Sequence, residues 1–163
     1  MEGIHKRDYR ECAIIVRTAS TEHSIVHERE AFVVTTTKGP GRGNVYRGES
    51  LGISPYGSRL VAGAEPILVI SDHKMGLMTE VKSFMIETED SIYLIEYKPD
   101  KKLFKVEKIK GNKGEMGVGN RLYPTFLDLC YGRLTLEDER MNKMHVTSPI
   151  KNIFAFYGRE NLP

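Results

Sequence analysis

The chain has 163 residues, of which 40% are hydrophobic and 28% are charged. These fractions are ordinary for a globular protein and exclude a disordered or fibrous chain. The formal net charge of +2 argues against the dense basic surface of a protein that binds duplex DNA along one whole face.

No segment of the sequence is typical of a membrane span or a secretion signal. The longest apolar runs, such as 12–16 and 66–70, are far shorter than the roughly 20 residues that cross a bilayer. Residues 1–10 are polar and charged, without the apolar stretch of a signal peptide. We therefore expect a cytoplasmic protein that does not bind a membrane.

Most of the chain has the composition of β-strands. Segments rich in Val, Ile, Thr, Phe and Tyr that are bounded by Gly, Pro or Asp predict strands, and the turn 98–101 predicts a hairpin. A helix is an alternative only in the short segments 125–130 and 136–144. The predicted strands are 12–18, 24–37 with a break at 28–30, 67–71, 77–88, 91–98, 103–109, 131–136 and 145–156.

Two short blocks recur in the same order along the chain. Residues 21–26 match residues 88–93 with four identities at an offset of 67. Residues 74–84 match residues 143–153 with three identities at an offset of 69. Because the spacing between the blocks is similar in both halves, the sequence predicts an internal repeat. Convergence of two hairpin edges on similar patterns is the alternative.

We expect a mainly β fold with little helix. Repeat units of about 65 to 70 residues with several strands close into small barrels or rolls, because closure removes exposed strand edges. The predicted architecture is two tandem, related small β-barrels or rolls, or one pseudo-symmetric double β-roll. The units are predicted at 11–85 and 86–157, packed rigidly together because no Gly/Ser/Pro linker separates them.

A sequence pattern marks both ends of the second half. Thr88, Ser91 and Tyr93 fit a first strand that reads T-x-x-S-x-Y, while 147–150 and Ile153 fit a last strand that reads T-S-P-V-x-x-I with isoleucine in place of valine. In these residues the chain resembles short uncharacterised β-rich proteins of bacteria and phages. The resemblance implies a small β fold and a prokaryotic or phage origin, and it carries no activity.

A basic, glycine-rich segment lies between the two blocks of each half, at 38–48 and 108–123. Glycines allow backbone N–H groups to converge on an anion, arginine can hold a phosphate with two hydrogen bonds, and tyrosine can stack on a base. Neither segment matches a nucleotide-binding motif, and solvated hairpin tips are the alternative. The candidate ligand-binding residues are Lys38, Arg42, Tyr46, Arg47, Lys110, Lys113, Arg121 and Tyr123.

The sequence offers no catalytic set, no metal site and no cofactor motif. His23 and His27 are four residues apart, but zinc needs three or four converging ligands. The serine-containing turn 52–58 lacks the G-x-S-x-G pattern of a nucleophile elbow. The acidic cluster at 87–90 is expected to be solvated.

The sequence therefore favours a non-enzymatic protein whose basic loops capture an anionic ligand, either a nucleotide or a short single-stranded nucleic acid. One concrete form is a phage-type sponge for a signalling nucleotide, with the repeats or a homo-oligomer supplying symmetric sites. One alternative is a protein–protein adaptor that acts through strand edges or the aromatic tail 154–157. Another is a small hydrolase or phosphodiesterase that uses His23 or His27.

Overall fold

The computed structural model describes residues 14–55, 57–71, 80–81, 83–98, 100–114, 116–130, 132–138 and 143–155, with the backbone alone at 80, 81, 130, 138, 143 and 155. These residues form sixteen β-strands and no helix. Every strand pair is antiparallel. The expectation of a mainly β fold is confirmed. The described part of the chain contains no helix that could cross a membrane.

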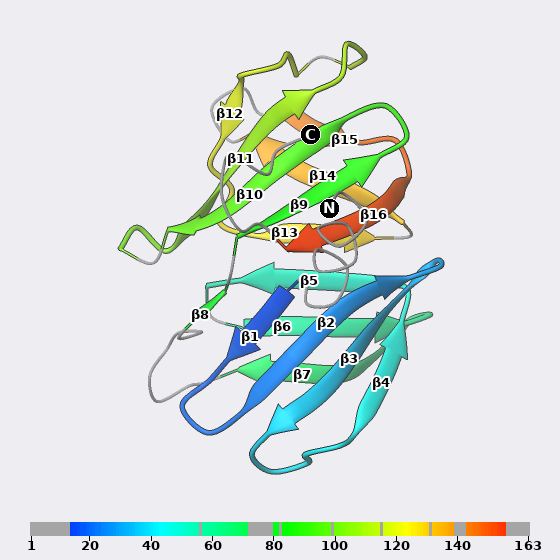
Figure 1. The fold of residues 1–163 in the computed structure, drawn as a ribbon, viewed down its shortest axis with the longest axis vertical. Coiled ribbons are helices and arrows are strands. Elements are labelled where there is room, and N and C mark those ends of the chain that lie inside the picture. Colours follow the sequence, from blue (N-terminus) through cyan, green and yellow to red (C-terminus); the bar gives the residue numbers. More distant parts are fainter. Residues whose placement is uncertain are drawn as a thin grey trace, which may run out of the picture.

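Two five-stranded sheets have the same strand order (Figure 1). The order is β4-β3-β2-β1-β8 in one and β12-β11-β10-β9-β16 in the other, so each strand of the second sheet is eight places after its counterpart. The first sheet contains β1 (Ile14–Arg17), β2 (Glu22–Glu28), β3 (Ala31–Lys38), β4 (Val45–Gly48) and β8 (Glu80–Val81). The second contains β9 (Phe84–Thr88), β10 (Ile92–Lys98), β11 (Leu103–Lys110), β12 (Arg121–Leu122) and β16 (Ile150–Ala155).

The third, central sheet crosses behind the other two and takes three strands from each half of the chain (Figure 1). Its order is β15-β14-β13-β5-β6-β7. The halves meet where β5 pairs with β13, with Gly52 opposite Asp128 and Leu51 opposite Leu129. The strands are β5 (Ser50–Ser54), β6 (Gly57–Ala62), β7 (Glu65–Ser71), β13 (Leu127–Cys130), β14 (Arg133–Asp138) and β15 (Lys143–Val146).

One apolar core joins the central sheet to both five-stranded sheets. Alternate residues of the central strands, such as Leu51, Leu129 and Leu136, are fully buried and belong to the same cluster as Phe32 and Phe104. Burial of each such side chain contributes about 1.5–3 kcal/mol. The core therefore runs without a break from the first half of the chain to the second.

The predicted barrels are not found, because the described strands form three sheets and none closes on itself. The reason is the β5–β13 pairing. Strands β5–β7 of the first half pair with strands β13–β15 of the second half in the central sheet. Neither group pairs back onto the five-stranded sheet of its own half. The shared sheet thus covers the edges of β5 and β13, while β7 and β15 remain edge strands.

The two helical alternatives are wrong where the structure describes them. Segment 125–130 contains β13, and the described residues of the second segment, 136–138 and 143–144, belong to β14 and β15. Leu134 and Leu136 are buried while Arg133 and Glu137 are exposed, which is the period of two that strands require. The hairpin turn at 98–101 is confirmed, since β10 pairs with β11 across it.

The two five-stranded sheets match each other at a different offset from the one that the sequence predicts. The backbone N–H of Thr18 donates to Thr21 O (3.0 Å), and that of Thr88 donates to Ser91 O (2.8 Å). Both hairpins carry a bulge one residue into the next strand. Thr18 therefore occupies the place of Thr88, and the predicted alignment of Thr21 with Thr88 is wrong by three residues.

The second block is also shifted. Val81 of β8 lies opposite Val16, and Ile153 of β16 lies opposite Ile86. The residues at this place in the two sheets are 72 positions apart (81 and 153), where the sequence match predicts 69. Residues 74–79 and 82 of that block lie outside the described residues.

Gly111 is required by a close approach of backbone to backbone. Its φ is +118°, and a Cβ there would lie 2.5 Å from Asp90 O and 2.9 Å from Ser91 Cα. Gly39 approaches Ser20 O in the same way in the first half. We expect Gly111→Ala to lower the free energy of unfolding by about 2–4 kcal/mol, because steric overlap adds to backbone strain.

Gly114→Ala in the same loop is the matched control. Gly114 also has a positive φ of +90°, but no atom lies within 4 Å of the place that a Cβ would take. Only backbone strain remains, so we expect a loss of about 1–2 kcal/mol. Urea unfolding of both variants measures the difference, and equal losses would contradict the close approach.

Candidate functional site

The eight predicted ligand-binding residues fall in two places rather than one. Four lie at the loop 39–44 between β3 and β4, and four lie at the loop 111–120 between β11 and β12. Figure 1 shows these loops at opposite ends of the molecule. The two segments therefore cannot contribute to one common pocket within a single chain.

The glycines that the loops share serve a common turn. Gly43 N donates to Thr36 O and Gly119 N to Lys108 O, each at 2.8 Å. Gly43 and Gly119 have φ values of +94° and +89°. This left-handed conformation favours glycine, so these glycines are explained by the turn without a bound anion.

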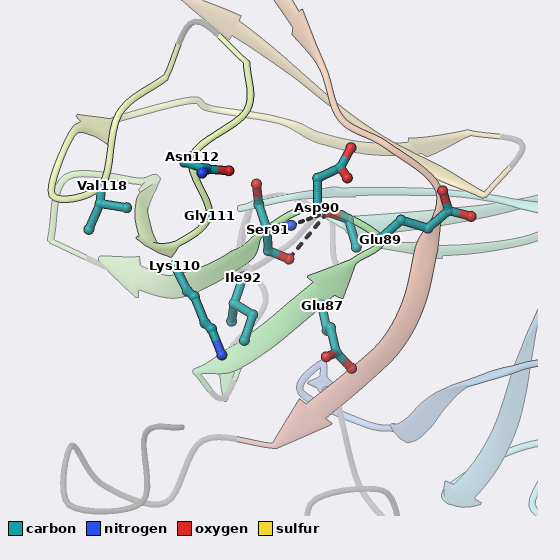
Figure 2. Close-up of a pocket in the computed structure, with 10 residues that line it drawn as sticks. Glu87, Glu89, Asp90, Ser91, Ile92, Lys110, Gly111, Asn112 and Val118 are labelled. Carbon is teal, nitrogen blue, oxygen red and sulfur yellow. Dashed lines mark hydrogen bonds between the residues drawn. The ribbon is translucent and has the colours of Figure 1, made fainter.

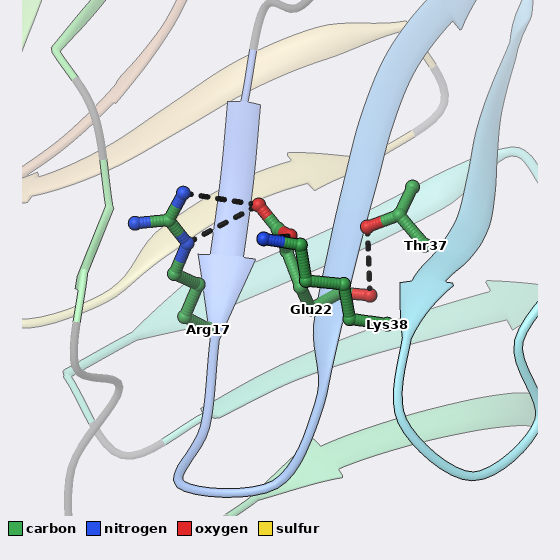
Figure 3. Close-up of polar contacts among 4 residues, drawn as sticks. All are labelled: Arg17, Glu22, Thr37 and Lys38. Carbon is green, nitrogen blue, oxygen red and sulfur yellow. Dashed lines mark hydrogen bonds and ion pairs between the residues drawn. The ribbon is translucent and has the colours of Figure 1, made fainter.

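In the first loop, the charge of Lys38 is engaged by Glu22. Lys38 Nζ lies 3.3 Å from Glu22 Oε2, and Arg17 donates to Glu22 Oε1 from Nε (3.2 Å) and Nη2 (3.1 Å). Figure 3 shows the two cations around the Glu22 carboxylate. Partial desolvation alone would raise the pKa of Glu22, but the hydrogen bonds and charges of Arg17 and Lys38 lower it overall.

The other three predicted residues of the first loop do not converge. Arg42 is exposed in the turn and Arg47 is exposed on β4. Tyr46 is half-buried against the core, and its hydroxyl accepts a hydrogen bond from Asn44 Nδ2 (3.4 Å). None of these three side chains lines the depressions described below.

Two of the predicted cations in the second half also have carboxylate partners. Lys113 Nζ lies 3.5 Å from Asp90 Oδ1, and Arg121 Nε donates to Glu107 Oε1 at 3.1 Å. Tyr123 is 46% exposed, which leaves its ring open to solvent. Exposed pairs of this kind are weak, so they do not prevent the lysine or arginine from binding another anion.

Lys108, a residue that the sequence pattern did not single out, is the most unusual cation in the described chain. It is 1% exposed, and its Nζ donates to Lys113 O (2.5 Å) and Met116 O (2.7 Å). The alternation along β11 could have revealed it, because Phe104, Val106 and Lys108 occupy successive inward positions.

The partners of Lys108 are carbonyl oxygens rather than a carboxylate. In the described part of the chain no ion pair involves Lys108. Glu115 follows in the same loop but lies outside the described residues. A lysine ammonium has three N–H donors, and the two carbonyls accept two of them.

The loop 111–120 separates two depressions. The first, the acidic depression, has a volume of about 550 Å³ and is lined by Glu87, Glu89 and Asp90 together with Lys110. Figure 2 shows the side chains of Glu87, Glu89 and Asp90 pointing in different directions from the hairpin that lines this depression. Its lining has three carboxylates and one cation, so it does not favour a phosphate beside Lys110.

The second depression, here named the Lys108 depression, has a volume of about 270 Å³. Its polar lining comes from Tyr93, Lys108, Lys113, His145 and Thr147. Thr147 Oγ1 accepts from Leu134 N (3.1 Å) and donates to Ser148 O (2.9 Å), so its hydroxyl proton is already engaged. The surroundings combine two cations with a phenol and an imidazole, which is a set of groups that can bind an anion.

Tyr93 remains a hydrogen-bond donor at neutral pH. Burial raises the pKa of its phenol, and the nearby Asp90 charge raises it further, against a lowering contribution from a hydrogen bond with Ser91. A phenol with a raised pKa keeps its proton. Tyr93 can therefore donate to an anion in the Lys108 depression.

The first half has a neutral network at the place of Lys108. His23 pairs with Thr36 in β2–β3 as Tyr93 pairs with Lys108 in β10–β11. His23 Nδ1 lies 3.1 Å from Thr36 Oγ1, and its Nε2 lies 3.1 Å from Thr21 Oγ1. Burial lowers the pKa of His23, which keeps the imidazole neutral.

His23 and His27, which lie four residues apart in the sequence, have separate contacts. His27 packs on Phe32 with ring centroids 5.1 Å apart, and it does not converge with His23 on a common point. Among the described residues, no three His, Cys, Asp or Glu side chains gather as metal ligands.

Comparison with known proteins finds no matching family model, no matching curated protein and no matching solved structure. The case for a function therefore rests on the chemistry of the Lys108 depression itself.

The ion pairs of Glu22 with Arg17 and Lys38, here called the Glu22 cluster, are expected to stabilise the fold in a way that acid weakens. Because the pKa of Glu22 is lower in the folded chain than its ordinary value of 4.5, the cluster stabilises fully above that value and loses its effect as the pH falls through the lowered pKa. We expect Glu22→Gln to show a smaller loss of stability than the wild type on acidification from about pH 6.

Urea unfolding at a series of pH values measures this difference. Glu30→Gln, in the exposed turn after β2, is the control and should follow the wild type. If Glu22→Gln also follows the wild type at every pH, the ion pairs of Figure 3 do not stabilise the fold.

Proposed function

We propose that this chain is a non-enzymatic protein that binds a phosphate-bearing ligand in the Lys108 depression. The observation that carries the proposal is the buried ammonium of Lys108, which has carbonyl partners but no ion pair in the described part of the chain. A buried charge is costly unless it is paired as well as hydrogen-bonded, and the described residues give Lys108 hydrogen bonds without a carboxylate. A phosphate group in the adjoining depression would supply the opposite charge.

The other groups that line the depression suit the same ligand. Lys113 is 73% exposed at its rim and can turn from Asp90 to an anion because exposed ion pairs are weak. Tyr93 and His145 add further polar contacts. Ligand pockets measure about 300–1,000 Å³, so a volume of about 270 Å³ favours a mononucleotide-sized ligand or one phosphate-bearing end over a longer strand.

We further infer that the two halves arose by duplication and that one half now carries the binding site. The identical strand order of the two five-stranded sheets supports the duplication. Thr36 stands at the place of Lys108, which supports a single site per chain. A cytoplasmic sponge for a signalling nucleotide remains the concrete form of this proposal, with one ligand per chain rather than two.

The test is calorimetric titration with inorganic phosphate and with linear and cyclic mononucleotides. Lys108→Met removes the charge but keeps an unbranched apolar side chain, and we expect it to weaken binding about tenfold or more, since hydrogen bonds to charged groups contribute about 1.5–3 kcal/mol. Lys113→Ala should weaken binding by about threefold, because its exposed charge contributes less.

Lys101→Ala, in the exposed turn between β10 and β11, is the matched control and should bind like the wild type. Circular dichroism and thermal unfolding establish that each variant is folded. Unchanged affinity in folded Lys108→Met, or an equal loss in Lys101→Ala, would show that the depression is not the site.

A further inference from the structure

The outer face of the central sheet carries exposed apolar side chains. Residues that alternate with the core positions point to this face, away from both five-stranded sheets. Exposure is 62% for Val69 on β7, 60% for Val146 and 64% for Met144 on β15, and 48% for Phe126 beside β13. β7 and β15 are the two edge strands, so exposed apolar residues stand at both edges of the face and, with Phe126, between them. Exposed apolar residues spread over one face in this way suit an interaction surface.

Phe126 lies at the middle of this face. A Cβ built on Gly52 would be only 2.5 Å from Phe126 Cζ, so the ring rests directly on the backbone of β5. The absence of a side chain at Gly52 is what makes this contact possible. A half-exposed aromatic ring at the centre of a sheet is the type of residue that dominates binding energy at interfaces.

Two charges of opposite sign flank Gly52 on the same row of the sheet. Arg59 on β6 and Asp128 on β13 are the direct neighbours of Gly52 in the adjacent strands. In the described part of the chain neither forms an ion pair. Burial raises the pKa of Asp128, as expected for a half-buried carboxylate without a cation beside it.

We propose that this face binds a second copy of the chain, face to face. The two-fold axis lies between the two copies, runs parallel to β5 and passes over Gly52. Arg59 and Asp128 lie one strand to either side of that axis, at about 4.8 Å per strand. The rotation therefore places Arg59 of each copy opposite Asp128 of the other. Because each Phe126 ring rests on Gly52, the two rings meet at the axis.

The size of the face sets the strength of this dimer. Six strands at about 4.8 Å spacing make a face about 24 Å wide, and the strands are short. Such a face is smaller than the roughly 800 Å² per partner of a standard interface. The dimer is therefore weak, and it forms with increasing protein concentration.

Analytical ultracentrifugation over a range of concentrations, with the full chain, tests the proposal by charge exchange. The wild type shifts from monomer to dimer as its concentration rises. Arg59→Asp and Asp128→Arg each place like charges opposite one another and weaken the dimer at least tenfold. The double variant restores opposite charges and recovers the wild-type dissociation constant within about threefold.

Arg47→Asp on the exposed side of β4 is the control of equal charge change and leaves the dimer unchanged. Phe126→Ser weakens the dimer, and thermal unfolding establishes that each variant is folded. A wild type that stays monomeric at every concentration overturns the proposal. So does a double variant that is no better than the single ones. Both results are independent of phosphate binding.

Discussion

The pairing of β5 with β13 is the constraint on which the rest of the structure depends. It joins the two halves of the chain through one sheet, with Leu51 opposite Leu129 and Leu127 opposite Ile53. Because these leucines and the isoleucine face the common core, a break in the pairing would expose apolar surface in both halves at once. The pairing also explains why neither half closes into a barrel, since its three-stranded group already has a neighbour.

The two halves bury a different polar residue at the same place in their five-stranded sheets. At the inward position beside the bulge, β3 carries Thr36 and β11 carries Lys108. Thr36 is satisfied by His23, which is neutral and hydrogen-bonded on both ring nitrogens. An ammonium needs stronger acceptors, and the longer loop 111–120 provides two carbonyls. The extra loop length and the buried lysine are therefore parts of one local change, and together they form the wall of the Lys108 depression.

The sequence predicts the long hairpins well and the short strands poorly. Buried positions alternate in β2, β3 and β11, β10 begins with a continuous apolar run, and clear turns separate these strands, so their pattern identifies them. Strands β4 to β6 contain Gly48, Gly52 and Gly57, and glycine has low strand propensity. Their position depends on contacts such as that between Phe126 and Gly52, which join residues far apart in the chain and leave no local signal.

The candidate site shows the same limit for a different reason. Residue type and glycine content draw attention to exposed cations, but Lys38, Lys113 and Arg121 all have carboxylate partners. The composition of the loop does not distinguish Lys108 from the other lysines, because its burial is visible only in the structure. The sequence match aligned His23 with Asp90, whereas the strand pairing puts His23 at the place of Tyr93. This shift of three residues concealed that Lys108 stands at the place of Thr36.

Burial also changes how the proposed site responds to salt. Exposed cations attract phosphate through a screened field, and their contribution falls within a Debye length of about 8 Å at physiological ionic strength. A buried ammonium is screened far less, because counterions cannot surround it. In the proposed site, Lys113 at the rim would therefore supply the salt-dependent share of binding and Lys108 the salt-independent share. The proposal thus needs no generally basic surface, in keeping with a net charge of only +2.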